Sequence, residues 1–134
     1  MKIEIEKPRH FVSPVNWYLA SILVRCEWED GKIDNFNRRC LAWENQILIK
    51  ASCPEEAYIK AMEKGKSEEG GEIWRNGDEN LKGKWHFEGL TSLLAIYDEL
   101  EDGAEIVWTE YRNRSVKTIQ RRVKSKEELE VFGG

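Results

Sequence analysis

His86 and Glu88 have the spacing that most resembles a catalytic or metal-binding pair. Two residues apart on an expected strand, they share one face, and an imidazole beside a carboxylate can exchange protons or supply two metal ligands. The only other histidine is His10, in an irregular N-terminal stretch. We therefore interpret the pair as the solvent side of a strand, and the sequence predicts no catalytic residue, no metal site and no cofactor.

Cys53 comes immediately before Pro54, at the expected start of a helix, where the helix dipole favours a thiolate. Neither a base nor a second cysteine is adjacent, so an ordinary cap position explains it better than a reactive thiol. The chain has three cysteines, an odd number without C-x-x-C spacing, which predicts neither a disulfide framework nor a zinc site. Reduced thiols predict a cytoplasmic protein.

Basic residues gather near the C-terminus. Residues 112–134 hold seven basic and three acidic residues, a net of +4, so the remainder carries −8 to give the total of −4. The candidates for binding phosphate or an acidic partner are Arg112, Arg114, Lys117, Arg121, Arg122 and Lys124. The same pattern describes an edge strand protected by charge, and the acidic body disfavours a general nucleic-acid binder.

A strand over 17–28 must position any site in this chain, because its alternation is the clearest. Every even position is apolar, which predicts a face packed on a core. The odd positions begin apolar, with Trp17, Leu19 and Leu23, and become polar later. Together with Trp108, these three residues predict a second apolar face, which on a monomer is exposed and suits a protein partner or a homodimer.

A second strand over 40–51 places its odd positions on the core, including Trp43, and a moderate loop predicts antiparallel pairing with the first strand. A helix over 54–65 follows. Pro54 suits its first position, and Glu56 and Lys60 are spaced for a surface ion pair.

The C-terminal half gives weaker patterns. Residues 72–83 are expected to form a loop and 84–90 a strand with Trp85 and Phe87 inward, while 91–100 fits either a short helix or a continuation of that strand. A fourth strand is predicted over 104–112 and a possible fifth over 115–123. The acidic residues between 98 and 105 lack calcium-loop spacing and indicate a solvated turn. Ser125 and Glu128 form a capping box for a last helical turn.

These elements predict an α+β fold: an antiparallel sheet of four or five strands with one main helix on one face, in the order β-β-α-β-β, plus a short C-terminal helix. The length of 134 residues indicates one domain, with a core over 17–112 and peripheral extensions at 1–16 and 113–134. The longest apolar run, near 17–24, is too short to cross a bilayer, so no membrane partner is expected.

Four phrases together resemble a bacterial family described only as domain of unknown function 4288. They are Trp17-Tyr-Leu-Ala-Ser, Ala51-Ser-Cys-Pro-Glu-Glu-Ala-Tyr-Ile-Lys-Ala, Trp85-His-Phe-Glu-Gly and Tyr97-Asp-Glu-Leu-Glu-Asp-Gly-Ala-Glu. The resemblance covers residues 17–112 and implies a small α+β domain in bacteria. It implies no activity, ligand or catalytic residue, and Cys53 departs from the small oxygen-bearing residue expected at that cap.

Three classes of function follow, in order of support. The first is a non-enzymatic interaction module that binds a protein partner or itself. The second is a small-ligand or nucleic-acid binder that uses residues 112–126. The third, an enzyme using His86, Glu88 or Cys53, has the least support because no catalytic constellation accompanies these residues.

Overall fold

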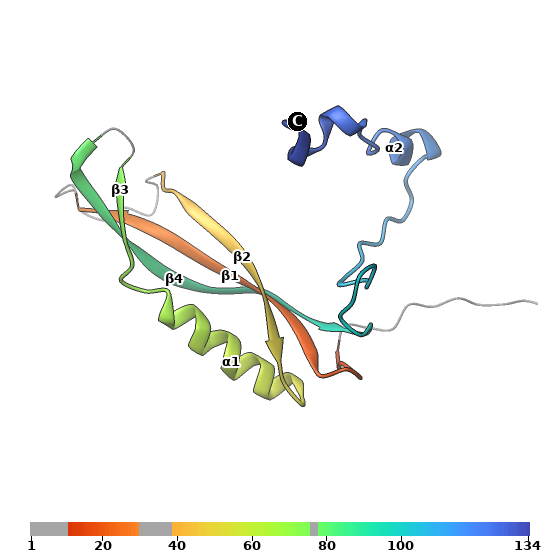
Figure 1. The fold of residues 1–134 in the computed structure, drawn as a ribbon, viewed down its shortest axis with the longest axis horizontal. Helices are drawn as coiled ribbons and strands as arrows, with labels where there is room; N and C mark the ends of the chain where they lie inside the picture. Colours follow the sequence, from red (N-terminus) through yellow and green to blue (C-terminus); the bar gives the residue numbers. More distant parts are fainter. Residues whose placement is uncertain (1–10, 30–38, 76–77) are drawn as a thin grey trace, which may run out of the picture.

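The computed structural model describes residues 11–29, 39–75 and 78–134, and Figure 1 shows its arrangement. The elements in chain order are β1 (Trp17–Trp28), β2 (Ala42–Lys50), α1 (Pro54–Ser67), β3 (Glu72–Arg75), β4 (Asp78–Ile96), α2 (Val116–Gln120), η1 (Lys126–Glu128) and η2 (Glu130–Phe132). The four strands form one curled antiparallel sheet in the order β2-β1-β4-β3. The predicted α+β class, with an antiparallel sheet and one main helix, is therefore confirmed.

β1 is the central strand of the core. Its alternate residues Tyr18, Ala20, Ile22 and Val24 are buried on the side where α1 lies. We call this side the inner face and the opposite side the outer face. Since period-two alternation sends neighbouring side chains to opposite sides, the strand predicted over 17–28 is confirmed together with its buried face.

α1 approaches the inner face closely because its buried positions are small. Ala57, Ala61 and Gly65 are its buried residues. A Cβ atom on Gly65 would lie 2.3 Å from Cε1 of the Phe87 ring, so only glycine fits there without a shift. The predicted helix is confirmed and extends two residues further, to Ser67, with a proline at its start and Cys53 as its N-cap residue.

β4 corrects the prediction for the C-terminal half. The expected loop over 72–83 is wrong, because β3 and the start of β4 occupy it, and the strand expected over 84–90 is the middle of β4. The ambiguous stretch 91–100 continues as a strand to Ile96. Two register shifts against β1, between Ser21 and Ile22 and between Leu23 and Val24, interrupt the simple alternation in β4.

The fourth and fifth strands expected over 104–112 and 115–123 are wrong, because residues 104–115 belong to no strand or helix and 116–120 form α2. Ser115 opens α2 by accepting a hydrogen bond from the Thr118 N–H, which favours a helical turn over an extended strand. The predicted capping box of Ser125 and Glu128 is confirmed at η1. Residues 109–134 are all exposed, and Figure 1 shows the α2 region standing clear of the sheet.

The chain before β1 is held by one buried serine. The Ser13 hydroxyl donates to the Ile96 carbonyl and accepts from the Val15 and Trp17 N–H groups, at 3.2 and 3.1 Å. This hydroxyl joins the start of β1 to the end of β4. Among the described residues, no helix has the length and apolar character needed to cross a membrane.

Candidate functional site

The outer face of the sheet carries an apolar stripe at its first half. Leu19 of β1 pairs with Leu48 of β2 on one side and with Leu94 of β4 on the other, so three leucines cross three strands in line. Leu19 in the middle is nearly buried, whereas Leu48 is 48% exposed. Trp17 and Leu23 of β1 are half-buried on the same face, so the structure brings together three of the four residues predicted to form this surface.

Trp108 is placed differently from the other three. Its ring lies 6.4 Å from the ring of Tyr97, just beyond the end of β4. Tyr97 in turn packs against the core on the inner face. Trp108 therefore lies beyond the end of β4 and is not part of the leucine stripe. The residues beside Leu19 are Leu48 and Leu94.

No described helix other than α1 has residues buried against the sheet, because α2, η1 and η2 have no buried residue. α1 packs on the inner face, against the clusters around Tyr18 and Ile22. No described helix therefore covers the stripe of leucines on the outer face, and Leu48 is its exposed member.

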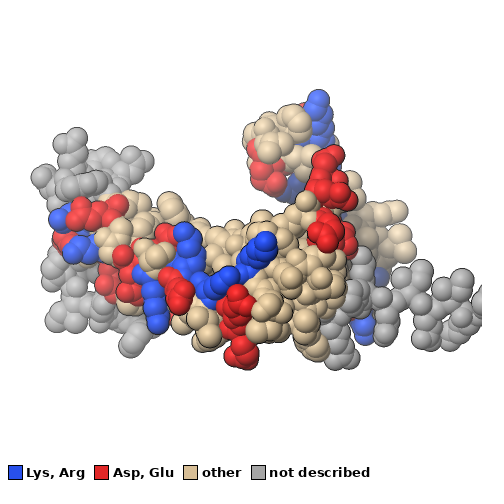
Figure 2. Space-filling model, turned by 60° about the horizontal axis from the view of Figure 1, so that its bottom comes forward, with Lys and Arg blue, Asp and Glu red and all other residues tan. Residues whose placement is uncertain are grey.

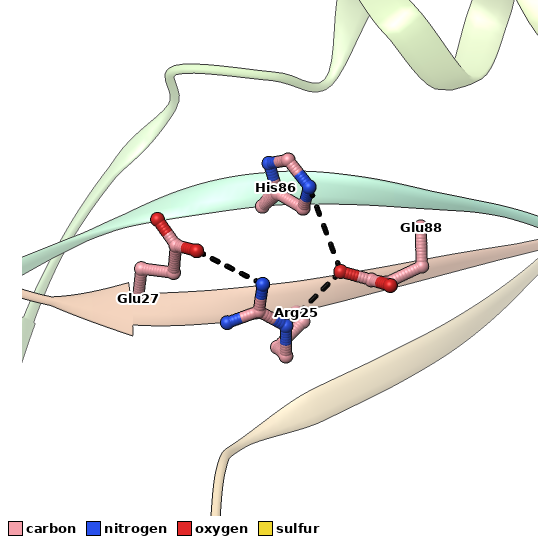
Figure 3. Close-up of polar contacts among 4 residues, drawn as sticks. All are labelled: Arg25, Glu27, His86 and Glu88. Carbon is pink, nitrogen blue, oxygen red and sulfur yellow. Dashed lines mark hydrogen bonds and ion pairs between the residues drawn. The ribbon is translucent and has the colours of Figure 1, made fainter. Parts of the chain in front are cut away.

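The second half of the outer face is polar and forms a surface ion network (Figure 3). Arg25 donates from Nη2 to Glu27 Oε1 at 2.9 Å and from Nε to Glu88 Oε1 at 3.0 Å. These carboxylates, first Glu27 and then Glu88, raise the pKa of Arg25. His86 Nε2 lies 3.6 Å from the same Glu88 oxygen.

The ion network places His86 and Glu88 on one face, but in a setting that does not favour catalysis. Arg25 occupies the Glu88 oxygen that a proton transfer to His86 would use. His86 and Glu88 are both exposed to solvent. No group of three or more potential metal ligands occurs among the described residues. The sequence missed Arg25 as a partner, because only the register that sets Arg25 opposite His86 reveals it.

Cys53 has the position predicted for it, but the described residues place no activating group beside it. Its side chain is exposed and makes no capping hydrogen bond. The acidic Glu55 and Glu56 already occupy the first turn of α1. His86 lies on the outer face, on the side of the sheet away from this helix. The thiol therefore has no imidazole beside it from β4.

Glu56 joins the first turn of α1 to Ser52, the residue before the N-cap. Its carboxylate accepts hydrogen bonds from the Ser52 hydroxyl at 2.6 Å and the Ser52 N–H at 3.1 Å, and Lys60 Nζ lies 3.2 Å away. These contacts, with Ser52 first and Lys60 second, lower the pKa of Glu56 to about 2. The predicted ion pair of Glu56 and Lys60 is present.

The basic segment, residues 112–126, lies outside the sheet with every side chain exposed. Arg112 pairs with Glu110, Arg122 lies 4.8 Å from the centre of the Tyr111 ring, and Lys124 donates to Glu130 at 2.7 Å. Within the described residues Arg114, Lys117 and Arg121 form no ion pair. The predicted cations therefore lie on one exposed segment, and four of the six, including Arg122, have no carboxylate partner among the described residues.

Charges elsewhere are mixed. On the face of the body visible in Figure 2, blue and red side chains are interleaved, and neither sign dominates. The turn after β4 is acidic and encloses a shallow hollow of about 360 Å³ lined by residues 97–99 and 101–104. Asp98 accepts from the Glu105 N–H at 3.0 Å, which gives this carboxylate a role in closing the turn.

Two indoles lie side by side on the inner face. The ring centres of Trp43 and Trp85 are 4.5 Å apart with the planes tilted by 40°. Trp43 is opposite Val24 and Trp85 is opposite Cys26, so the two indoles come from the strands on either side of β1. Trp43 lies on the predicted inner face but is only partly buried, because half of its side chain is exposed.

The comparison with known families agrees with this geometry. The sequence pattern of a family described as "Domain of unknown function (DUF4288)" matches residues 17–108. The chain belongs to this family. The match begins at the first residue of β1, spans all four strands and α1, and ends before the basic segment. The outer face of this DUF4288 domain thus lies inside the matched region. No match was found among curated proteins or among solved structures.

Proposed function

We propose that this DUF4288 domain is a non-enzymatic interaction module that binds a protein partner or a second copy of itself through its outer face. The observation that carries the proposal is the stripe Leu48-Leu19-Leu94, which crosses three strands with no described helix above it. An antiparallel sheet with one covered face normally presents polar residues on the other. Here only the half around Arg25 does so.

The physical reason is the free energy of apolar burial. Covering the exposed part of Leu48, together with the half-buried Trp17 and Leu23, removes apolar surface from water at roughly 25 cal/mol per Å². The Arg25 network beside the stripe supplies a polar rim, as protein interfaces commonly have. The three cysteines of the chain are free, which fits the reducing cytoplasm as the place of action.

Native mass spectrometry of the protein isolated from its own cells tests the proposal. We expect a dimer or a complex with another protein, and we expect Leu48→Asp to dissociate it because a carboxylate cannot be buried there unpaired. Glu63→Gln, exposed on α1 on the other side of the sheet, is the control and should retain the complex. A wild-type monomer with no protein partner, or a complex whose mass is unchanged by Leu48→Asp, contradicts the proposal.

A second candidate function is binding of a polyanion by the basic segment. The specific observation is that the first thirteen residues of this segment, 112–124, hold six cations and no acid, all exposed. If this segment binds DNA or RNA, log Kd should rise linearly with log salt, and removing Arg114 and Lys117 should reduce the slope. An absence of binding to single- and double-stranded oligonucleotides at low salt removes this candidate.

A further inference from the structure

The two edges of the sheet are built differently. β3 forms one edge with only four residues, and β2 forms the other with nine. A long strand with no neighbour on one side presents unpaired N–H and C=O groups, which other strands can pair with. Within the described part of the chain, β2 has a neighbour only on the β1 side.

The backbone of β2 directs its even-numbered residues outward. At one end the Leu41 carbonyl accepts from the Cys26 N–H, and at the other the Ala51 N–H donates to the Asn16 carbonyl. In an antiparallel ladder alternate residues direct both backbone groups to the same neighbour, so the odd residues face β1. The N–H and C=O groups of Ala42, Glu44, Gln46 and Leu48 therefore point away from the sheet, and all four residues are exposed.

β2 lacks most of the devices that prevent edge pairing. It contains no proline, and its register with β1 runs without a bulge from Ala42 to Lys50. The stretch 45–49, Asn-Gln-Ile-Leu-Ile, is uncharged. At the end of the strand one outward group is occupied, because Lys60 Nζ donates to the Lys50 carbonyl at 2.7 Å.

We infer that two copies of this chain pair through β2, antiparallel about a two-fold axis at Ile47, to form one continuous sheet of eight strands. The inference goes beyond the proposed function, because it uses the open edge of β2 and not the outer face, and it names the partner as a second copy. The outward backbone groups of each β2 supply the hydrogen bonds, and the symmetry makes the contact self-complementary.

Charge selects this register among the alternatives. The outward backbone groups of both copies belong to even-numbered residues, so each even residue of one β2 must lie opposite an even residue of the other. The two-fold axis must then pass through a residue and not between two residues. With the axis at Ile47, Glu44 faces the partner's Lys50 and Lys50 faces the partner's Glu44. An axis at Asn45 sets Glu44 against the partner's Gln46, and one at Gln46 sets it against the partner's Leu48. Of these three axes, only the one at Ile47 pairs both charges.

The same register brings apolar groups together on both sides of the joined sheets. On the inner face Ile47 meets the partner's Ile47, and each is already packed against the core that α1 covers. On the outer face Leu48 lies beside the partner's Gln46. The two leucine stripes then approach each other across the new junction, which explains why Leu48 is the most exposed of the three leucines.

Disulfide trapping tests the register. In a chain carrying Cys40→Ser and Cys53→Ser, the only remaining native thiol is the buried Cys26. Ile47→Cys in this background is expected to form an intermolecular disulfide, because residues opposite each other at a non-hydrogen-bonded pair have Cα atoms about 4.5 Å apart, within the range that a disulfide needs. Leu48→Cys is the matched control and should not cross-link, since its partner in this register is Gln46. Cross-linking of the Leu48→Cys chain alone, or of neither chain, overturns the register.

Gln46→Pro tests the backbone pairing itself. The Gln46 N–H points away from β1, so proline at this position removes two symmetry-related hydrogen bonds of the dimer and none between β1 and β2. We expect the dimer dissociation constant to rise roughly tenfold or more, while Gln46→Ala leaves it nearly unchanged. An unchanged circular dichroism spectrum shows that the proline variant still folds. A proline variant that folds and dimerises as well as the Gln46→Ala variant overturns the inference.

A charge reversal gives an independent check. Glu44→Lys should weaken the dimer by placing two lysines opposite each other, and adding Lys50→Glu should restore it. The outcomes separate the two proposals. A wild-type dimer that survives Gln46→Pro and does not trap at residue 47 removes the β2 pairing but leaves association through the outer face. If the chain binds a different protein and forms no dimer, the β2 pairing is likewise ruled out, and binding through the outer face is kept.

Discussion

The two faces of the sheet come from the same strands, but a described helix covers only one of them. On the inner face, residues with little or no side chain on α1, including Ala57 and Gly65, bring the helix into contact with Ile22 and Phe87. On the outer face the central strand presents leucines first and an ion network later, and no described helix covers them. The alternation in β1 thus specifies two apolar surfaces, and within the described chain a helix covers only the inner one.

The largest difference between the faces is expected from a pair of neighbouring residues. Ile22→Ala removes a fully buried side chain from the inner face and should lower the free energy of unfolding by about 2–5 kcal/mol. Leu23→Ala, on the half-buried outer face, should cost about 1 kcal/mol in the monomer. Urea denaturation at low protein concentration measures both. Equal losses would show that the outer face is as tightly packed as the inner one.

The next effect concerns the closeness of α1. Gly65→Ala places a methyl group against the Phe87 ring and should destabilise the fold by about 1–3 kcal/mol through overpacking. Lys66→Ala, exposed on the same helix, serves as the control and should change stability by less than about 0.5 kcal/mol. Combining Phe87→Leu with Gly65→Ala should recover part of the loss. If Gly65→Ala is neutral, the helix is not held as closely as the inner face requires.

A smaller effect is expected in the polar half of the outer face. Arg25→Met leaves Glu27 and Glu88 without their shared cation, and unfolding free energy should fall by about 0.5–1 kcal/mol because the pairs are partly exposed. The loss should shrink in high salt, and Arg25→Lys should recover only part of it, since one ammonium group cannot reproduce the two guanidinium contacts. A salt-independent loss would point instead to packing of the arginine side chain.

The smallest effect lies at the start of α1 and depends on pH. Because the pKa of Glu56 is lowered to about 2 in the folded chain, its contribution to stability is present above the ordinary carboxyl pKa and is lost as pH falls toward 2. NMR titration of the carboxyl group should show that Ser52→Ala raises this pKa toward its ordinary value, because the serine contacts are the main cause. Lys60→Ala should raise it less. The reverse ranking would contradict the assignment.

Sequence patterns were sufficient where the alternation is unbroken. They located β1, β2 and α1 because each keeps one period from end to end. In β4 the two bulges shift the parity, so the inner-face positions opposite β1 become Phe87, Leu90, Leu93 and Ala95. Inner-face residues that are three apart, as here, have the spacing of a helix face, which explains why residues 91–100 fitted both a helix and a strand. The loop expected over 72–83 was wrong because polar residues also occur in paired strands, as in β3 and the first part of β4.

Strand propensity was misleading beyond β4. Ile106, Val107 and Trp108 favour a strand by residue type, but residues 104–112 form no strand in the described chain. The candidate surface was predicted in part. Trp17, Leu19 and Leu23 follow from the alternation of one strand, whereas Leu48 and Leu94 join them only through the register between strands. The open edge of β2 likewise depends on strand order, which no single stretch of sequence specifies.

The close approach of Trp43 and Trp85 has an optical consequence. Two indoles this near and tilted by 40° couple their electronic transitions, so the folded chain should show a pair of circular dichroism bands of opposite sign in the far ultraviolet. The signal arises only while β2 and β4 are both docked on β1. This signal therefore reports formation of the sheet, and it can be followed separately from the helical signal of α1.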